Sequence, residues 1–463
     1  MGRTNVVRVR CRGSLVGLGL VILMGFGLSS VSAVDARAQA GAGGAASLQI
    51  DPRIQELLEE VSEERLRALV DGLAAFETRH TLSSTDDPDR GIGAARDWMV
   101  DELRGYSDRL QVDLDCYRIA EQGRITREAE ICNVKAVLPG RSDRRVYVSG
   151  HYDTVAQIPE GVEDVWAPYD NPAPGANDDG SGTALAMELA RVLAQSGLEF
   201  DATLVFIGFA GEEQGLFGAR LHAQRAEEEG LRIDAVFNND VVGNITGGNG
   251  LQDGASVRLF SPGPTDSPAR QLARYIRRHG GAYLPSHQVR LIAREDRFGR
   301  GGDHTPFNWH GFAAVRMTES KEDYSRQHTV DDTPDGVDEA YLARNARVNL
   351  AGVASMALAP PAPFVDNEQG LPRLDRGETG YDARLQWDPS PGAVAYRIFV
   401  RTAWTPDWEE VVTVGDVEEW TFPDLSIDDY IFGVAAVGAG GHESLVSAYV
   451  RPPREAEPVQ TVP

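Results

Sequence analysis

The sequence has little positive charge for its length. Its 463 residues include 45 lysines and arginines against 70 aspartates and glutamates, so the formal net charge is −25. A nucleic-acid-binding protein must neutralise phosphates, and this charge balance therefore argues against a nucleic-acid partner. Only Lys135 and Lys321 are lysines, a skew from which no function follows.

A long apolar run near the N-terminus is also missing. The apolar stretch at residues 15–28 is too short for a comfortable membrane span. It follows four arginines, Arg3, Arg8, Arg10 and Arg12, and it precedes the small-residue segment "SSVSA". This order is typical of a secretory signal peptide, cleaved after Ala33 or Ala38. We therefore expect a periplasmic or secreted protein without a membrane span after signal cleavage.

Cysteine is scarce, with three residues in the whole chain. Cys11 leaves with the signal peptide, and no cysteine follows the apolar stretch to serve as a lipoprotein anchor. Cys116 and Cys132 remain, an even pair in an oxidising compartment, which favours a disulfide that closes a hairpin-like segment. The alternative is two unrelated buried thiols.

Strands and helices alternate over residues 55–358, which predicts an α/β domain with a mostly parallel mixed sheet flanked by helices. Helices are expected at 57–76, 92–103, 183–197, 215–229, 268–279 and 337–358. A proline-rich linker (359–375) then leads to short strands with turn signals (376–451), which predict a small β-sandwich. The sandwich resembles a fibronectin type III domain. The remaining segments are the signal peptide and leader start (1–38), a flexible leader (39–54) and a disordered tail (452–463).

Metal-type side chains follow three predicted strands of the large domain. His151 and Asp153 come after "RRVYVSG", Glu212 and Glu213 after "ATLVFIGFAG", and Asp240 after "IDAVFNN". In an open parallel sheet, ligands bind at the carboxyl ends of the strands. These residues are therefore expected at one edge of the sheet.

Two loops add further candidates. "PGANDDGSG" presents Asp178 and Asp179 between glycines, where Asp179 or Ser181 would also suit an ordinary helix N-cap. "DYSRQHTVDDTPD" places His328 in polar surroundings. The other histidines of the large domain and sandwich receive a structural interpretation: His80, His222, His279, His287, His310 and His442.

Neutral imidazoles and carboxylates are the ligands of catalytic zinc. Two histidines, two aspartates and one glutamate are too many for one zinc, and they suit two zinc ions that share a carboxylate. The zinc-protease pattern HExxH is absent, which excludes a thermolysin-like site.

The ordered segments "HYDT", "PGANDDGSG", "GFAGEEQGLFGA", "NND" and "QHTVDDT" resemble the co-catalytic dizinc aminopeptidase family, which includes secreted bacterial leucyl-type aminopeptidases, glutamate carboxypeptidases and glutaminyl cyclases. The resemblance implies that His151 and Asp240 hold one zinc, that Glu213 and His328 hold the other, and that Asp178 bridges them. It also implies that Glu212 is the general base and that Asp153 orients the ring of His151.

The sequence departs from that family at two positions. Some relatives place an oxyanion-stabilising tyrosine before the last histidine, where this chain has Gln327, and Tyr324 is the candidate substitute. In "GGDHTPF" a glycine replaces the family's serine, and Asp303 and His304 are expected to line the site without binding metal.

The resulting prediction is an exported aminopeptidase that acts on peptides. The alternatives are a carboxypeptidase or a glutaminyl cyclase on the same scaffold. For the carboxypeptidase, Arg294, Arg297 and Arg300 would supply cations near a substrate carboxylate. A non-catalytic binding protein is a third interpretation, disfavoured because the ligand set and base are complete. The sandwich is a candidate for attachment to a surface or glycan.

Overall fold

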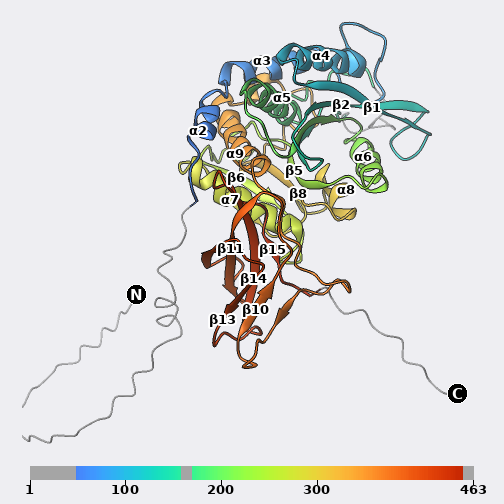
Figure 1. Cartoon of the computed structure of the whole chain (residues 1–463). Helices are drawn as coiled ribbons and strands as arrows, with labels where there is room; N and C mark the ends of the chain where they lie inside the picture. The colour runs from blue at the N-terminus through green and yellow to red at the C-terminus, as the bar shows by residue number, and fades with distance from the viewer. Residues whose placement is uncertain (1–47, 158–168, 452–463) are drawn as a thin grey trace, which may run out of the picture. The chain divides into compact units, whose positions relative to one another are not determined.

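A computed structural model describes residues 48–157 and 169–451 of the chain (Figure 1). The predicted signal peptide, most of the predicted leader and the predicted tail lie outside these residues, as does part of the loop that follows Asp153. The described residues all belong to one compact unit. Within them, no helix has the length and apolarity that a membrane crossing requires.

Eight strands of the described chain form one mixed sheet in the order β1-β2-β4-β3-β5-β8-β6-β7. The strands are β1 (Gln111–Ile119), β2 (Ala129–Leu138), β3 (Arg145–His151), β4 (Thr203–Phe209), β5 (Ile233–Asn239), β6 (Ser256–Phe260), β7 (Gln288–Ile292) and β8 (Ala314–Glu319). The central strands β4, β3, β5 and β8 are parallel, whereas β1, β2 and β4 pair antiparallel, as do β6 and β8. This arrangement confirms the predicted fold class.

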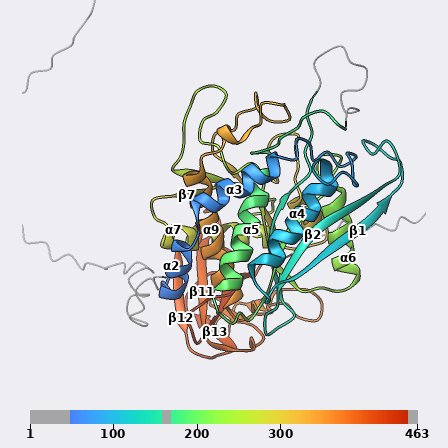
Figure 2. The ribbon, with the colours of Figure 1, turned by 90° about the horizontal axis from the view of Figure 1, so that it is seen from above.

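Helices cover both faces of this sheet. They are α2 (Pro52–Glu59), α3 (Glu63–Ala74), α4 (Gly91–Tyr106), α5 (Gly180–Gln195), α6 (Phe217–Glu228), α7 (Pro268–Tyr283), α8 (His304–Trp309) and α9 (Glu339–Ala357). Figure 2 shows α4 and α6 on opposite sides of β1 and β2. Side chains alternate along β4, so that Leu204 and Phe206 join the larger core, whereas Val205 and Ile207 join a smaller core with residues of α6 and α8.

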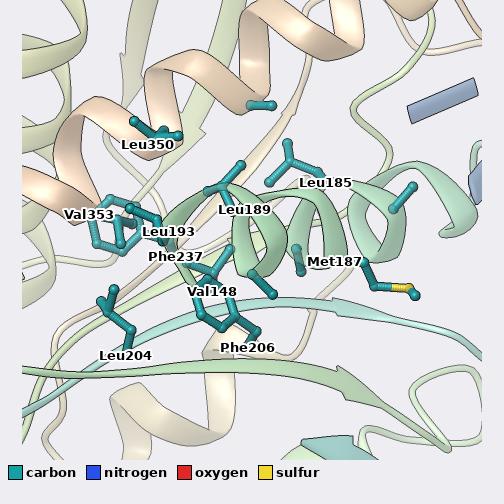
Figure 3. Packing of buried hydrophobic residues seen from close by; sticks show 14 of the residues in the cluster. Val148, Leu185, Met187, Leu189, Leu193, Leu204, Phe206, Phe237, Leu350 and Val353 are labelled. Carbon is teal, nitrogen blue, oxygen red and sulfur yellow. The ribbon is translucent and has the colours of Figure 1, made fainter. Parts of the chain in front are cut away.

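The larger core is built on α5 and α9, which pack over the central strands. Figure 3 shows Leu189 and Leu193 of α5 beside Val148, Phe237 and other buried side chains. Burying an apolar side chain of this size stabilises the fold by about 1.5–3 kcal/mol. The packing therefore holds the strand ends, where the candidate site residues lie, on a rigid base.

The N-terminal helical region differs from the prediction of one helix over 57–76. The structure has two helices, α2 and α3, because the chain breaks after Glu59 and restarts at Ser62. The Ser62 hydroxyl accepts a hydrogen bond from the backbone N–H of Arg65, and this N-cap starts the second helix. The short elements β6, β7 and α8 were also not predicted.

The C-terminal residues form two antiparallel sheets. One contains β13 (Glu419–Phe422), β10 (Ala383–Gln386) and β9 (Leu374–Asp375). The other contains β12 (Glu410–Val414), β11 (Ala393–Thr402), β14 (Tyr430–Gly438) and β15 (Ser447–Ala448). Val365 and Trp387 belong to the core of this all-β part. The prediction of a linker over 359–375 is therefore wrong in part, because Val365 and β9 in this range belong to the packed all-β part.

Candidate metal centre

The carboxyl ends of the three parallel strands β3, β4 and β5 meet at one edge of the sheet. His151 is the last residue of β3, Glu212 and Glu213 follow β4 after a short turn, and Asp240 follows β5 directly. Asp178 lies two residues before α5 begins at Gly180. The sheet topology therefore brings together residues that are far apart in the sequence.

Asp178 lies between the two histidines. Its Oδ1 is 3.3 Å from His151 Nε2, and its Oδ2 is 3.1 Å from His328 Nε2. Asp240 Oδ1 lies 3.9 Å from His151 Nε2, and Glu213 Oε1 lies 3.2 Å from His328 Nε2. The five residues thus form two groups that share one carboxylate, with the potential ligand atoms of each group within 4.8 Å of one another.

The chemistry of these groups fits divalent zinc. Within the described part of the chain, Glu213 Oε1 is buried without a hydrogen-bond partner, although His328 Nε2 is close. The carboxylate of Glu213, assisted by Asp178, raises the pKa of His328 to about 11. Burial alone would lower the pKa of His151, but the carboxylates around it raise that pKa. Such a field favours cations among the oxygens, which zinc would supply.

Glu212 lies beside these ligand groups. Its carboxylate falls within 4.8 Å of ligand atoms of His151 and Glu213. Burial, together with the carboxylates of Glu213 and Asp240, outweighs the opposing effect of His151 and raises the pKa of Glu212 to about 8. This position beside the site is the one that a proton-transferring base needs.

Asp153 lies beside the ring of His151 and contacts more than this one residue. His151 Nδ1 lies 3.1 Å from the backbone oxygen of Asp153 and 3.6 Å from its carboxylate. The carboxylate oxygens also accept hydrogen bonds from the backbone N–H groups of Glu212 and Glu213, each at 3.2 Å. Asp153 therefore lies against the ring with both its backbone and its carboxylate, and its side chain also holds the turn that carries both glutamates.

Asp179 caps α5, as one sequence interpretation expected. Its carboxylate accepts from the backbone N–H groups of Gly182, His151 and Val241, at 2.9–3.1 Å. One side chain thereby ties the start of α5 to the ends of β3 and β5.

Tyr324 does not reach the ligand groups through any hydrogen bond found among the described residues. Its hydroxyl donates to Glu322 at 3.2 Å, and 62% of the residue is exposed. Its assignment as the oxyanion-stabilising residue stays a prediction without structural support. Gln327, which occupies the family's tyrosine position, is buried and donates to the same glutamate.

Asp303 and His304 lie in the buried surroundings of the site. Both are almost fully buried, and the two carboxylate oxygens of Asp303 have no hydrogen-bond partner in the described structure. Burial, together with the charge of Glu212, raises the pKa of Asp303.

The arginines proposed for a carboxypeptidase are partly engaged. Arg297 pairs with Glu322 at 2.6 Å and is mostly buried, and Arg294 lies over the ring of Phe298. Arg300 is exposed and donates to Gln327.

Sequence reasoning missed two residues that support the ligands. Arg316 is fully buried on β8 and donates to Asp240 Oδ1 at 2.6 Å and to Asp296 Oδ2 at 3.1 Å. Asp332 accepts from the backbone N–H groups of Asn177 and Asp178. The sequence does contain a signal for Arg316: it is a lone arginine inside the apolar strand "AAVRMTE", and a buried arginine needs a carboxylate partner.

Comparisons with known proteins identify the family of this chain. The profile of peptidase family M28 matches residues 133–353. A probable zinc metalloprotease of Pyricularia oryzae is 41% identical over 435 residues, which covers 85% of this chain and 84% of the relative. Another from Leptosphaeria maculans is 37% identical over 432 residues, covering 85% and 96%.

Solved structures show the same fold at lower identity. The LapA aminopeptidase of Legionella pneumophila is 19% identical, with a TM-score of 0.53 over 74% of this chain and 80% of that chain. A glutaminyl cyclase of Porphyromonas gingivalis is 18% identical, with a TM-score of 0.50 over 63% and 97%. Because close relatives align along most of both chains, and the family profile covers the strands and loops that carry the site, this chain belongs to peptidase family M28.

Proposed function

We propose that this protein is an exported zinc aminopeptidase with two metal ions. The observation that carries the proposal is the position of Asp178, which has one carboxylate oxygen near His151 Nε2 and the other near His328 Nε2. The relatives named as probable zinc metalloproteases support zinc as the metal.

The residues divide into two zinc-binding groups. His151 and Asp240 would hold one ion, Glu213 and His328 would hold the other, and Asp178 would contact both. When bound, zinc supplies Lewis-acid polarisation of the scissile carbonyl and lowers the pKa of a water to about 7.

Glu212 would move the proton. It lies beside the ligands without being needed to complete either group. We infer that its carboxylate takes a proton from the attacking water and returns it to the departing amine of the cleaved peptide. The turn held by the Asp153 carboxylate keeps Glu212 and Glu213 in their separate positions.

The substrate would be a peptide with a free N-terminal amine. The negative charge of the site and of the whole chain favours a cationic chain end. Export is supported by the signal-like N-terminal sequence and by the disulfide between Cys116 and Cys132, a bond typical of oxidising compartments. The fibronectin-like character of the sandwich, and a role for it in attachment to a surface or glycan, remain parts of this proposal.

The test is a panel of chromogenic aminoacyl substrates, their N-acylated counterparts and an N-terminal glutaminyl peptide. Aminopeptidase action predicts cleavage of the free-amine substrates alone, loss of activity with a chelator, and recovery with zinc. Metal analysis should find two zinc ions per chain. Cyclisation of the glutaminyl peptide, one bound zinc, or cleavage that survives chelation would contradict the proposal.

A further inference from the structure

The segment between α3 and α4 reaches the candidate metal centre from outside the family match. Residues 79–81 precede the matched range, 133–353. Even so, the Thr81 hydroxyl donates to Asp153 Oδ2 at 3.0 Å and contacts the side-chain amide of Gln214. Thr81, Asp153 and Gln214 are each at least 95% buried, so water does not compete for these hydrogen bonds.

We propose that Thr81 is a positioning residue of the active site, which acts through Asp153 on the turn that carries Glu212 and Glu213. This inference rests on the function proposed above. Asp153 Oδ2 accepts from Thr81 and from the Glu213 N–H, and Oδ1 accepts from the Glu212 N–H. Fixing that carboxylate therefore fixes both glutamate backbones.

The donors and acceptors around Thr81 form a directed chain. The structure places two oxygens, Asp153 Oδ2 and Gln214 Oε1, at the Thr81 hydroxyl, which has one hydrogen to donate. We assign that hydrogen to the Asp153 carboxylate, which requires the Gln214 amide to be turned so that its NH2 group donates to the hydroxyl oxygen. The Leu82 N–H donates to His80 Nδ1, which leaves the hydrogen of a neutral ring on Nε2, facing the same amide. The amide oxygen of Gln214 therefore belongs on the His80 side.

Arg79 fixes the backbone that carries Thr81. Its fully buried guanidinium donates to the backbone oxygens of Tyr152, Pro174 and Gly175, at 2.6–2.9 Å. These oxygens belong to the loop after β3 and the loop before α5. The position of Thr81 is thus set by the same loops that present His151 and Asp178.

The expected consequence concerns the rate more than substrate binding. If the Asp153 carboxylate loses its third hydrogen bond, the turn gains freedom, and Glu212 samples positions from which proton transfer fails. Loss of a partner behind a ligand or catalytic group costs about 10–100-fold in affinity or activity. We expect Thr81→Val to lower kcat by about tenfold under saturating zinc, with little change in KM.

The experiment compares Thr81→Val, Thr81→Ser and a control, Thr203→Val. Thr203 begins β4 at its opposite end, where its hydroxyl accepts from Gly140 and donates to Ser142. Hydrogen exchange of the peptide 210–216 supplies a readout independent of activity. Thr81→Val should speed exchange at 212 and 213 by about tenfold and lower kcat, because their N–H groups lose a fixed acceptor. Thr81→Ser should restore both, and Thr203→Val should change neither.

Unchanged exchange and kcat in Thr81→Val would overturn the inference. So would equal losses in Thr81→Ser, or the same pattern in Thr203→Val, since either would show general loosening. If Thr81→Val does not fold, Gln214→Met removes the other partner of the Thr81 hydroxyl. It should change the exchange at 212 and 213 and kcat in the same direction, by a smaller factor. No change in either quantity would count against the inference. An enzyme without aminopeptidase activity would contradict the proposed function, while the exchange result would still decide the role of Thr81.

Discussion

At the scale of single residues, the two adjacent glutamates differ through their surroundings. Glu213 Oε1 is buried beside His328 and lacks a hydrogen-bond partner in the described structure, as expected of a metal ligand. Glu212 is less buried and faces His151. The two adjacent carboxylates repel each other. A bound metal cation would offset this repulsion and so stabilise both in their charged form.

Replacing Glu212 by Gln should remove proton transfer without removing a ligand. We expect kcat to fall by about 10²–10⁴-fold, because general acid–base catalysis contributes that much. Zinc content should remain that of the wild type, whereas Glu213→Gln should lose zinc as well as activity. Steady-state kinetics with metal analysis checks both variants. Equal zinc loss in the two would show that Glu212 is a ligand and not the base.

At the scale of elements, a disulfide joins the two strands of the β1–β2 hairpin, and a buried carboxylate joins the hairpin to α6. Cys116 and Cys132 lie directly opposite each other in the antiparallel register and form a disulfide, which confirms the predicted pairing. The buried carboxylate of Asp115 binds His222 Nδ1 at 2.7 Å and Arg225 at 2.6 Å, both on α6. Because α6 follows the Glu212 turn, this contact anchors the segment behind the site.

Asp115→Asn should destabilise the fold in a pH-dependent way. Burial raises the pKa of Asp115, but hydrogen bonds from His222, Tyr117 and Asn133 outweigh it and hold the pKa at about 2. A depressed carboxyl pKa stabilises the fold above the unfolded value, about 3.9, and this stabilisation disappears as the pH falls through about 2.

We expect Asp115→Asn to lose about 2.5 kcal/mol of unfolding free energy at pH 7, with the difference from wild type shrinking as the pH falls from about 4 toward 2. Urea unfolding of both proteins across this range is the measurement. A difference that stays constant with pH would show that the charge of Asp115 contributes nothing.

At the scale of the whole molecule, the all-β part packs against α7 through buried charges. Glu443 pairs with Arg278 of α7 and with Arg397 of β11, and it is 2% exposed. Asp266 binds Arg401 at 2.6 Å across the same contact. Removing one partner of a buried ion pair leaves an uncompensated charge, which makes such a contact sensitive to substitution.

Glu443→Gln should therefore lower the unfolding free energy by about 3 kcal/mol. The control is Glu419→Gln, which breaks an exposed pair with Arg384 and should leave the midpoint unchanged. Calorimetry of the wild type should show one cooperative transition for the described unit. Two well-separated transitions, or equal effects of the two substitutions, would mean that the all-β part is only loosely attached.

The sequence by itself determined the fold class, the ligand candidates and the disulfide. Those predictions depend on short-range patterns: apolar runs in β3 and β4, and polar residues directly after each strand. Strand periodicity and the rule that parallel strands end at one edge were sufficient to place His151, Glu213 and Asp240 together.

Only the tertiary structure decided which groups support those ligands. The Thr81–Gln214 contact spans 133 residues, and Arg316 meets Asp240 across 76, so no local pattern announces either one. The contacts of the Asp153 carboxylate with the backbone N–H groups of Glu212 and Glu213 depend on packing in the same way. Local composition sets which elements form, whereas the pairing of buried polar groups is fixed by the requirement that each finds a partner once the elements pack.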